Sequence, residues 1–216
     1  DASKAYAEAL KIDPKYADAS IGLARLELTQ RKADAAIAAL DGVLASTPDS
    51  SDALIMKADI IRSKGDKDAA KDLYLRALTA DKSKVQAYLG LIGLELESGQ
   101  VAEARKYLQA AQKLSPDNIY VRHLEAMILL QEKQPDQALS AVLDVLKVAP
   151  SFPAANMLAA NIEFSKGLYQ QSAAHVNAVL VGSPNSLSAR RLLAAILYKQ
   201  NELEKASAIL VELMER

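Results

Sequence analysis

Few residues in this sequence are able to do acid–base, nucleophilic or metal chemistry. There are two histidines, His123 and His175, and no cysteine, so disulfides, thiolate metal sites and cysteine nucleophiles are excluded. Ser172 precedes His175 by three positions, which places both on one helix face, but a catalytic triad also needs an orienting carboxylate and an oxyanion site. The sequence indicates neither, and it has no paired-histidine motif or glycine-rich phosphate loop. We therefore predict a protein that is not an enzyme and holds no metal or cofactor.

The charged residues do not point to a nucleic-acid partner. The chain has 26 Lys and Arg against 27 Asp and Glu, whereas phosphate binding needs a surplus of cations. The two signs are mixed along the sequence, as in Asp66-Lys67-Asp68, which is typical of solvated helix surfaces. Half of the residues are apolar, enough for a packed core, but no apolar run is long enough to predict a transmembrane segment.

The elements that position these residues follow a 34-residue period. Several independent columns of proline, alanine and glycine share it. The prolines are Pro14, Pro48, Pro116, Pro150 and Pro184; one alanine column is Ala2, Ala36, Ala70, Ala104, Ala138 and Ala206, with Ser172 in its gap; a second is Ala24, Ala58, Ala126, Ala160 and Ala194, broken by Ile92; the glycines are Gly65, Gly99 and Gly167. We interpret the alanines as packing residues, because small side chains let two helices approach closely.

Each repeat is predicted to form two helices. In residues 85–118, apolar residues recur at helical spacing from Val85 to Glu97 and again from Ala102 to Leu114. Gly99 ends the first helix and Pro116 ends the second. Pro135 and Pro153 suit the first turn of later helices. No segment shows sustained strand alternation.

This pattern resembles the tetratricopeptide repeat (TPR) family. In residues 85–118 the resemblance is carried by Tyr88, Leu91, Ala104, Leu108, Ala111 and Pro116. Ile92, Arg122 and Arg190 depart from the family pattern, and the chain has no tryptophan. The resemblance implies an all-α, right-handed TPR superhelical solenoid. We expect one array over residues 1–216, divided into a partial repeat 1–16 and the repeats 17–50, 51–84, 85–118, 119–152, 153–186 and 187–216, within a longer protein.

A narrower resemblance rests on the phrase Ala7-Glu8-Ala9-Leu10-Lys11-Ile12-Asp13-Pro14 and on the alanine-rich repeats. These features are similar to bacterial secretion-associated TPR proteins, among them the lipoproteins linked to exosortase (PEP-CTERM) and exopolysaccharide loci. This resemblance implies a scaffold in the bacterial envelope or periplasm. The sequence itself leaves the compartment and the oligomeric state open, and uncapped array ends are expected to self-associate.

The TPR resemblance also implies where a ligand binds, because stacked helix pairs curve and their first helices line a concave face. The residues expected on that face are Ile21, Arg25, Ile55, Asp59, Arg62, Leu89, Gly93, Tyr120, His123, Met127, Met157, Asn161, Phe164, Arg191 and Tyr198. An apolar stripe with Met and aromatic members suits a peptide groove. The alternative is that these side chains only pack between repeats. For Gly93, close packing is favoured over a pocket in the groove floor, and His123 is taken as a groove or packing residue.

From these features we predict a protein-binding or peptide-binding scaffold. The carboxylate clamp of chaperone-binding TPR domains is not assembled, because Met157 stands where its lysine is needed before Asn161. Arg25, Arg62 and Arg191 are then either partners for acidic groups or solvated surface residues. The alternative function is a structural spacer in an envelope or exopolysaccharide secretion assembly. Carbohydrate binding ranks lower, because few aromatic side chains are available for it.

Overall fold

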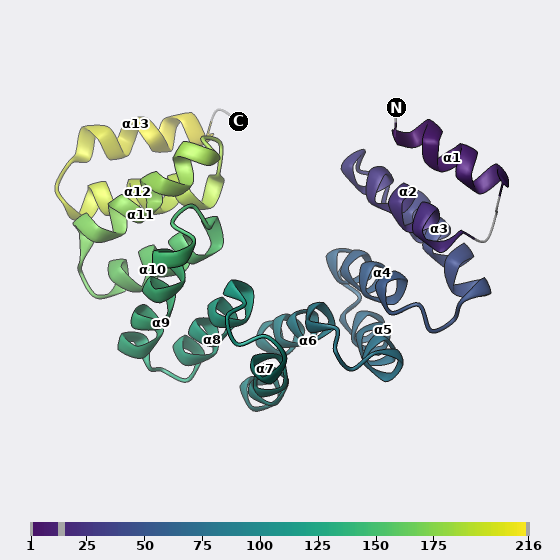
Figure 1. Ribbon diagram of the computed structural model, residues 1–216. Coiled ribbons are helices and arrows are strands. Elements are labelled where there is room, and N and C mark those ends of the chain that lie inside the picture. The colour runs from purple at the N-terminus through teal and green to yellow at the C-terminus, as the bar shows by residue number, and fades with distance from the viewer. Residues whose placement is uncertain (1, 13–15, 215–216) are drawn as a thin grey trace. The chain divides into compact units, whose positions relative to one another are not determined.

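The computed structural model describes residues 2–12 and 16–214, and over these ranges it contains thirteen α-helices and no strand (Figure 1). This confirms the all-α prediction. The first helices of the pairs are α2 (Ala17–Thr29), α4 (Ser51–Ser63), α6 (Val85–Glu97), α8 (Ile119–Gln131), α10 (Pro153–Ser165) and α12 (Leu187–Lys199). The second helices are α1 (Ala2–Ile12), α3 (Ala33–Ser46), α5 (Lys67–Ala80), α7 (Val101–Leu114), α9 (Pro135–Val148), α11 (Tyr169–Gly182) and α13 (Leu203–Met214). Pro14 lies outside the described residues.

The helices are divided between two compact units. Unit 1 comprises residues Asp1–Ser115 and contains α1 to α7, and unit 2 comprises Pro116–Arg216 and contains α8 to α13. Within each unit, the two helices of a pair pack against each other, and each second helix also packs against the first helix of the next pair. This local stacking is what the periodic sequence predicts, since each pair buries its apolar face on its neighbours.

The alanine columns lie at the helix crossings. Ala24, Ala36 and Ala58 are fully buried, and so are their equivalents in later repeats up to Ala160. Ser172, which fills the gap in one column, is also fully buried and donates a hydrogen bond to the Ala160 carbonyl oxygen at 2.7 Å. The larger Ile92 is accommodated with no exposure. The prediction that these columns serve packing is confirmed, except for the side chain of Ala2, which is outside the described part.

The two arginines that depart from the TPR pattern anchor turns. The Nε atom of Arg122 donates to the Pro116 carbonyl oxygen at 3.1 Å, and that of Arg190 donates to the Pro184 carbonyl oxygen at 2.9 Å. The Nδ2 atom of Asn156 likewise donates a hydrogen bond to the Pro150 carbonyl oxygen at 2.8 Å. Each bond satisfies a backbone acceptor just before a helix starts, where no helical partner exists. The departures therefore replace an apolar contact with a turn contact.

The turns between paired helices share one backbone conformation. Positive φ angles recur once per repeat, at Gly65 (92°), Gly99 (72°) and Gly167 (76°) and, without glycine, at Arg31 (59°), Lys133 (61°) and Asn201 (65°). Glycine adopts this left-handed conformation without steric cost, and other residues adopt it only where the surrounding helices impose it. The pair geometry therefore persists in repeats that lack the glycine.

Over residues 2–12 and 16–214, none of the helices combines the length and the apolarity needed to cross a bilayer.

Candidate peptide-binding surfaces

The residues predicted to line a groove fall into two sets, one in each unit. In unit 1, Arg25 and Asp59 are exposed and Arg62 and Leu89 are half-buried. Ile21, Ile55 and Gly93 are buried, and the two isoleucines belong to the apolar cores of the helix stack. Side chains buried in this way have little surface to offer a ligand, so in unit 1 the accessible part of the predicted set is mainly polar.

Two of the predicted residues of unit 1, Asp59 and Arg62, belong to a cluster of polar side chains. The Tyr74 hydroxyl donates a hydrogen bond to Oδ1 of Asp59. Arg62 forms an ion pair with Glu97, and its Nε donates to Glu97 Oε1 at 3.1 Å. We call Asp59, Arg62, Tyr74 and Glu97 the unit 1 polar cluster; a hollow of about 320 Å³ lies beside its three charged members and Ser63.

Electrostatics within the unit 1 polar cluster follow from burial and pairing. Asp59 is exposed as a residue, but neighbouring protein atoms partly desolvate its carboxyl and raise the pKa, although the Tyr74 hydroxyl and the Arg62 guanidinium oppose this shift. Burial and the Asp59 carboxylate together raise the pKa of Tyr74. The hydrogen bond from Arg62 lowers the pKa of Glu97. The polar groups of the cluster therefore already have partners within it: Arg62 pairs with Glu97, and the Tyr74 hydroxyl donates to Asp59.

Two glycines of α6 make room for this cluster. A Cβ atom at Gly90 would lie 2.3 Å from Cζ of the Tyr74 ring, and Tyr74 is fully buried. A Cβ atom at Gly93 would lie 2.6 Å from Nη2 of Arg62. The space above Gly93 is thus occupied by the Arg62 guanidinium. This is the close packing that the sequence favoured, whereas the contact of Gly90 with a tyrosine of the preceding helix was missed by sequence reasoning.

The predicted residues of unit 2 are more apolar and more accessible. Tyr120 and Tyr198 are exposed, and Met127, Met157 and Phe164 are half-buried. All five come from first helices, α8, α10 and α12. Asn161 is exposed, but its Nδ2 atom donates to the Met157 carbonyl oxygen of its own helix at 2.7 Å. Unit 2 therefore retains the Met and aromatic members of the predicted groove on its accessible surface.

His123 is the buried member of the unit 2 set. It is 8% exposed, its ring lies 5.3 Å from that of Phe152 at 65°, and burial lowers its pKa, so it is neutral at pH 7. Tyr120 also contacts Phe152, with the two ring centroids 5.3 Å apart and the ring planes at 77°. Edge-on contacts of this kind stabilise aromatic clusters. Sequence reasoning missed Phe152, which precedes Pro153 in a turn, because it was not expected on a helix.

Three predicted residues of unit 2 meet in one apolar hollow. Phe164, Arg191 and Tyr198 line a space of about 510 Å³ together with residues of α13. The other lining residues are Ala194, Ala195, Lys199, Leu203, Ala206, Ser207 and Leu210. We call this the α12–α13 hollow. The contribution of α13 was not predicted, because second helices were assigned only to packing.

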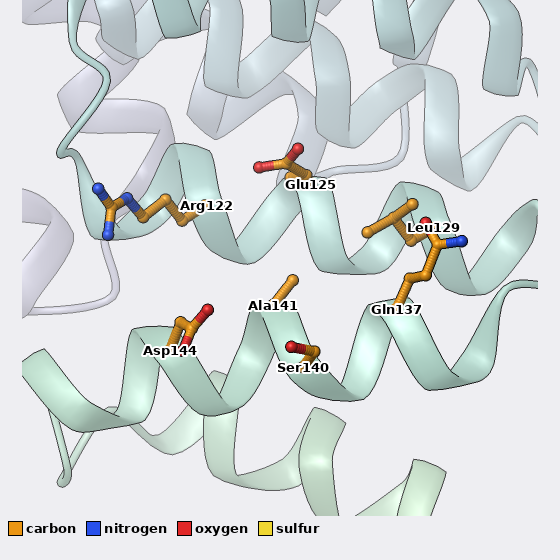
Figure 2. Close-up of a pocket in the computed structure, with 7 residues that line it drawn as sticks. All are labelled: Arg122, Glu125, Leu129, Gln137, Ser140, Ala141 and Asp144. Carbon is orange, nitrogen blue, oxygen red and sulfur yellow. The ribbon is translucent and has the colours of Figure 1, made fainter.

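A second hollow in unit 2 is polar (Figure 2). It measures about 400 Å³ and is lined by Arg122, Glu125 and Leu129 of α8 and by Gln137, Ser140, Ala141 and Asp144 of α9. Arg122 and Asp144 lie at one end of it, and Leu129 and Gln137 at the other. Arg122 is already paired with Asp117, and Asp144 with Lys147. None of its lining residues belongs to the predicted groove.

Comparison with known proteins decides the family. A family model described as Tetratricopeptide repeat matches residues 1–60 and 95–162, and a second model of the same description matches residues 55–119. The chain belongs to the tetratricopeptide repeat family. The resemblance inferred from the sequence is therefore confirmed, and TPR proteins as a class mediate protein–protein interactions.

The individual relatives support the fold but do not indicate an activity for this chain. Uncharacterized protein y4yS of Sinorhizobium fredii is 40% identical over 75 residues, which are 35% of this chain and 41% of that protein. The chain thus matches about two fifths of the length of this curated relative. The solved structure described as "Functional Characterization of Pseudomonas Aeruginosa pilF" is 20% identical with a TM-score of 0.74, covering 92% of this TPR chain and 90% of its own.

A third relative has a description that concerns binding. YrrB, described as a TPR protein with an unusual peptide-binding site, is 22% identical with a TM-score of 0.59 over 87% of this chain and 96% of its own. At this identity the likeness shows the fold alone. The narrower resemblance to exosortase-linked and exopolysaccharide-linked lipoproteins gains no support from these relatives.

The serine–histidine pair of this TPR chain is not arranged as a nucleophile and base. The Ser172 hydroxyl donates to the Ala160 backbone, whereas His175 Nδ1 lies 2.9 Å from Oδ1 of Asn156. His175 Nε2 lies 3.6 Å from Oε1 of Glu163, a carboxyl that is 4% exposed. Burial raises the pKa of Glu163 to about 6 and lowers that of His175. These contacts join α10 to α11 through a buried polar cluster.

Proposed function

We propose that this TPR chain is a non-catalytic scaffold that binds a protein or peptide on the face formed by its first helices. The observation that carries the proposal is the apolar surface of unit 2. Met127, Met157 and Phe164 are only half-buried, and Tyr198 is 64% exposed. Solvated helix faces are normally polar, so an accessible row of Met and aromatic side chains indicates a surface that a partner covers.

The chemistry of these side chains supports a peptide or helix as the ligand. Methionine is flexible and polarisable and adapts to partners of different shape, whereas aromatic side chains contribute a large contact area. Apolar contacts would exclude water from the bound segment, and Arg191 would set its register by pairing with an acidic group. In unit 1, the exposed Arg25 would have the same use. A family member described by its peptide-binding site is consistent with this use of the fold.

The proposal is tested with peptides selected from a random display library on the wild-type chain. The selected peptides are synthesised with a fluorophore and titrated by fluorescence anisotropy. Met127→Glu combined with Met157→Glu is expected to weaken binding at least about tenfold, because two charges would be desolvated in the contact. Circular dichroism establishes that the helices are retained.

A matched control makes the same chemical change on second helices. Val148 of α9 and Val181 of α11 are exposed, at 69% and 86%, and Val148→Glu with Val181→Glu is expected to leave binding unchanged. Equal binding by the wild type and the methionine variant would contradict the proposal. It would favour the alternative prediction of a structural spacer, in which the first-helix face carries no ligand.

A further inference from the structure

Asn156, Glu163 and His175, which we call the α10–α11 polar cluster, form a chain of polar contacts inside unit 2. Asn156 and Glu163 are 2% and 4% exposed, and His175 is half-buried. The Asn156 Nδ2 atom donates to the carbonyl oxygens of Pro150 and Phe152, at 2.8 and 3.1 Å. Because both amide protons are used in this way, Oδ1 is fixed as the Asn156 atom that faces His175.

The orientation of Asn156 determines the tautomer of His175. An amide oxygen only accepts hydrogen bonds, so His175 Nδ1, 2.9 Å from Asn156 Oδ1, carries a proton and donates it. The other nitrogen of a neutral imidazole then has a lone pair and no proton. That nitrogen, Nε2, lies 3.6 Å from Oε1 of Glu163. An ionised Glu163 would therefore face a lone pair, while its buried Oε2 atom has no hydrogen-bond partner among the described residues.

One proton shared by Glu163 and His175 removes this repulsion. Taken up from water, it lies on the carboxyl, which then donates to Nε2, or on Nε2, which then donates to the carboxylate. In both forms the buried anion is either neutralised or paired. When the proton returns to water at higher pH, an unpaired buried carboxylate is left facing a lone pair, and the contact is destabilised.

The equivalent glutamate of unit 1 is neutralised by a lysine instead. Glu95 occupies the position of Glu163 two repeats earlier, and its Oε1 lies 2.7 Å from the Lys71 ammonium of α5. The residue of unit 2 at the position of Lys71 is Leu139 of α9, which packs against the apolar core. In unit 2 a proton is therefore the cation that the buried glutamate has available.

Other ionisable groups on the helices around the α10–α11 polar cluster are engaged elsewhere. They are Asp136 with Lys166, Asp144 with Lys147, Arg190 with Glu212, Tyr169 on the Phe164 ring, and Arg191, Tyr198 and Lys199 around the α12–α13 hollow. Burial is the one cause of the raised pKa of Glu163 and of the lowered pKa of His175. The protonation of the pair is therefore set by its own contacts.

The α10–α11 polar cluster reaches the first-helix face through the turn before α10. Asn156 holds the backbone of this turn, and the Phe152 ring lies 5.3 Å from the rings of both Tyr120 and His123 of α8. Tyr120 is exposed on the predicted groove. A displacement of His175 that releases Asn156 would therefore disturb an aromatic contact on the face where a peptide is proposed to bind.

We infer that Glu163 and His175 form a proton-binding site whose occupancy favours peptide binding on the first-helix face of unit 2. With the proton bound, His175 holds Asn156 and the Phe152 turn in place; without it, repulsion from Glu163 displaces the ring and the turn loses this support. Burial raises the pKa of Glu163 to about 6, so the proton is bound below this value and lost as the pH rises through it. The link to peptides rests on the proposed function, whereas the proton site does not.

Nuclear magnetic resonance of the isotope-labelled chain tests the proton site without a ligand. The sequence has two histidines, so the signals of His175 are identified by their absence in His175→Gln. Between pH 5 and pH 8, Nδ1 of His175 is expected to stay protonated, while Nε2 and the Glu163 carboxyl carbon titrate with one shared midpoint. Glu163→Gln is expected to remove this step. An unprotonated Nδ1, or two independent midpoints, would overturn the inference.

Peptide titrations at pH 5 and pH 8 test the link to binding. They use library-selected peptides without ionisable groups whose affinity falls with Met127→Glu and Met157→Glu. The wild type is expected to bind about fivefold more tightly at pH 5 than at pH 8. Glu163→Gln, whose amide donates to Nε2 at either pH, is expected to bind at pH 8 as tightly as the wild type at pH 5. Glu95→Gln is the matched control and is expected to retain the fivefold difference, with folding verified by circular dichroism.

Equal wild-type affinity at the two pH values would overturn the inference. A difference that persists in Glu163→Gln would also overturn it, since another group such as His123 would then be responsible. Both results are distinguishable from failure of the proposed function, in which the Met127 and Met157 variant binds as the wild type does. The link to peptides would then be wrong as well, and the shared midpoint measured on the wild type would still decide the proton site.

Discussion

The contact between α5 and α6 in unit 1 and the contact between α9 and α10 in unit 2 use equivalent positions two repeats apart, but different residues fill them. In unit 1, the large Tyr74 faces the small Gly90. In unit 2, Val142 packs in one apolar cluster with the larger Leu158. The contact in unit 1 therefore joins a large residue to a residue without a side chain, whereas two medium-sized aliphatic residues share the equivalent contact in unit 2.

This difference determines the surface that each unit presents. The Tyr74 hydroxyl reaches Asp59, and Gly93 accommodates the Arg62 guanidinium, so unit 1 has a polar cluster on its first helices. The equivalent positions of unit 2 hold Met127 in place of Asp59 and Leu130 in place of Arg62. One exchange of large and small residues in the helix contact therefore accompanies a polar first-helix surface in unit 1 and an apolar one in unit 2.

The largest effect on stability is expected when only one position of the α5–α6 contact receives the residue found at the equivalent position of unit 2. Gly90→Leu places a side chain into the buried Tyr74 ring and should lower the free energy of unfolding by about 3 kcal/mol or more. Tyr74→Val should cost about 3 kcal/mol, because it leaves a cavity. The double variant copies the residue pair of unit 2. Its free energy of unfolding should therefore fall by less than the sum of the two single decreases, with a difference of at least about 2 kcal/mol. Urea unfolding followed by circular dichroism measures all three, and additive losses would show that the two positions are not coupled.

An effect of intermediate size is expected at two buried glutamates that occupy equivalent positions in the two units. Burial raises the pKa of Glu163 to about 6 from an ordinary value of 4.5, so its contribution to stability is complete below pH 4.5 and is lost as the pH rises through 6. The difference corresponds to about 2 kcal/mol. Glu163→Gln stays neutral and should therefore unfold at a higher urea concentration than the wild type at pH 8 but not at pH 4.

Glu95 in unit 1 provides the contrast to Glu163. Its Oε1 lies 2.7 Å from the Lys71 ammonium, whereas the basic group that faces Glu163 among the described residues is His175, at 3.6 Å and with a lowered pKa. Glu95→Gln removes an ion pair and should lower stability at pH 8 by about 1 kcal/mol, opposite in sign to Glu163→Gln. Glu204→Gln on exposed α13 is the control for loss of charge. A change in stability of the same sign at pH 8 for Glu95→Gln and Glu163→Gln would contradict this contrast.

The smallest effect is expected in the turns, which the two units share. Gly99 and Lys133 occupy the same position in neighbouring repeats and both have positive φ, at 72° and 61°. Gly99→Lys should lower the free energy of unfolding by about 1 kcal/mol. Lys133→Gly should raise it by a few tenths of a kcal/mol, because the relief of backbone strain exceeds the effect of the added entropy of the unfolded chain. Thermal unfolding of the two variants measures the difference. Equal and opposite changes would show that the chain entropy of glycine is negligible here.

Much of the fold was predictable because it depends on local pattern. The period of proline and alanine indicated the helix pairs, and the helices begin at the expected places, including Pro135 and Pro153 at first-turn positions. The site was predicted less completely. First-helix residues such as Met157 and Phe164 were identified from their place in the repeat, but the burial of Ile21, Ile55 and His123 depends on which side chains pack against them from other segments of the chain.

The sequence by itself determined that this protein is an array of repeated helix pairs in the tetratricopeptide repeat family, because helix periodicity, turn residues and small packing residues are properties of nearby positions. The tertiary structure decided which side chains of those helices reach the surface. Tyr74 fills the space above Gly90, Arg62 covers Gly93, and Leu203 and Leu210 join Tyr198 around an open hollow. Such contacts depend on the volumes that meet between helices, and a pattern along one helix does not contain them.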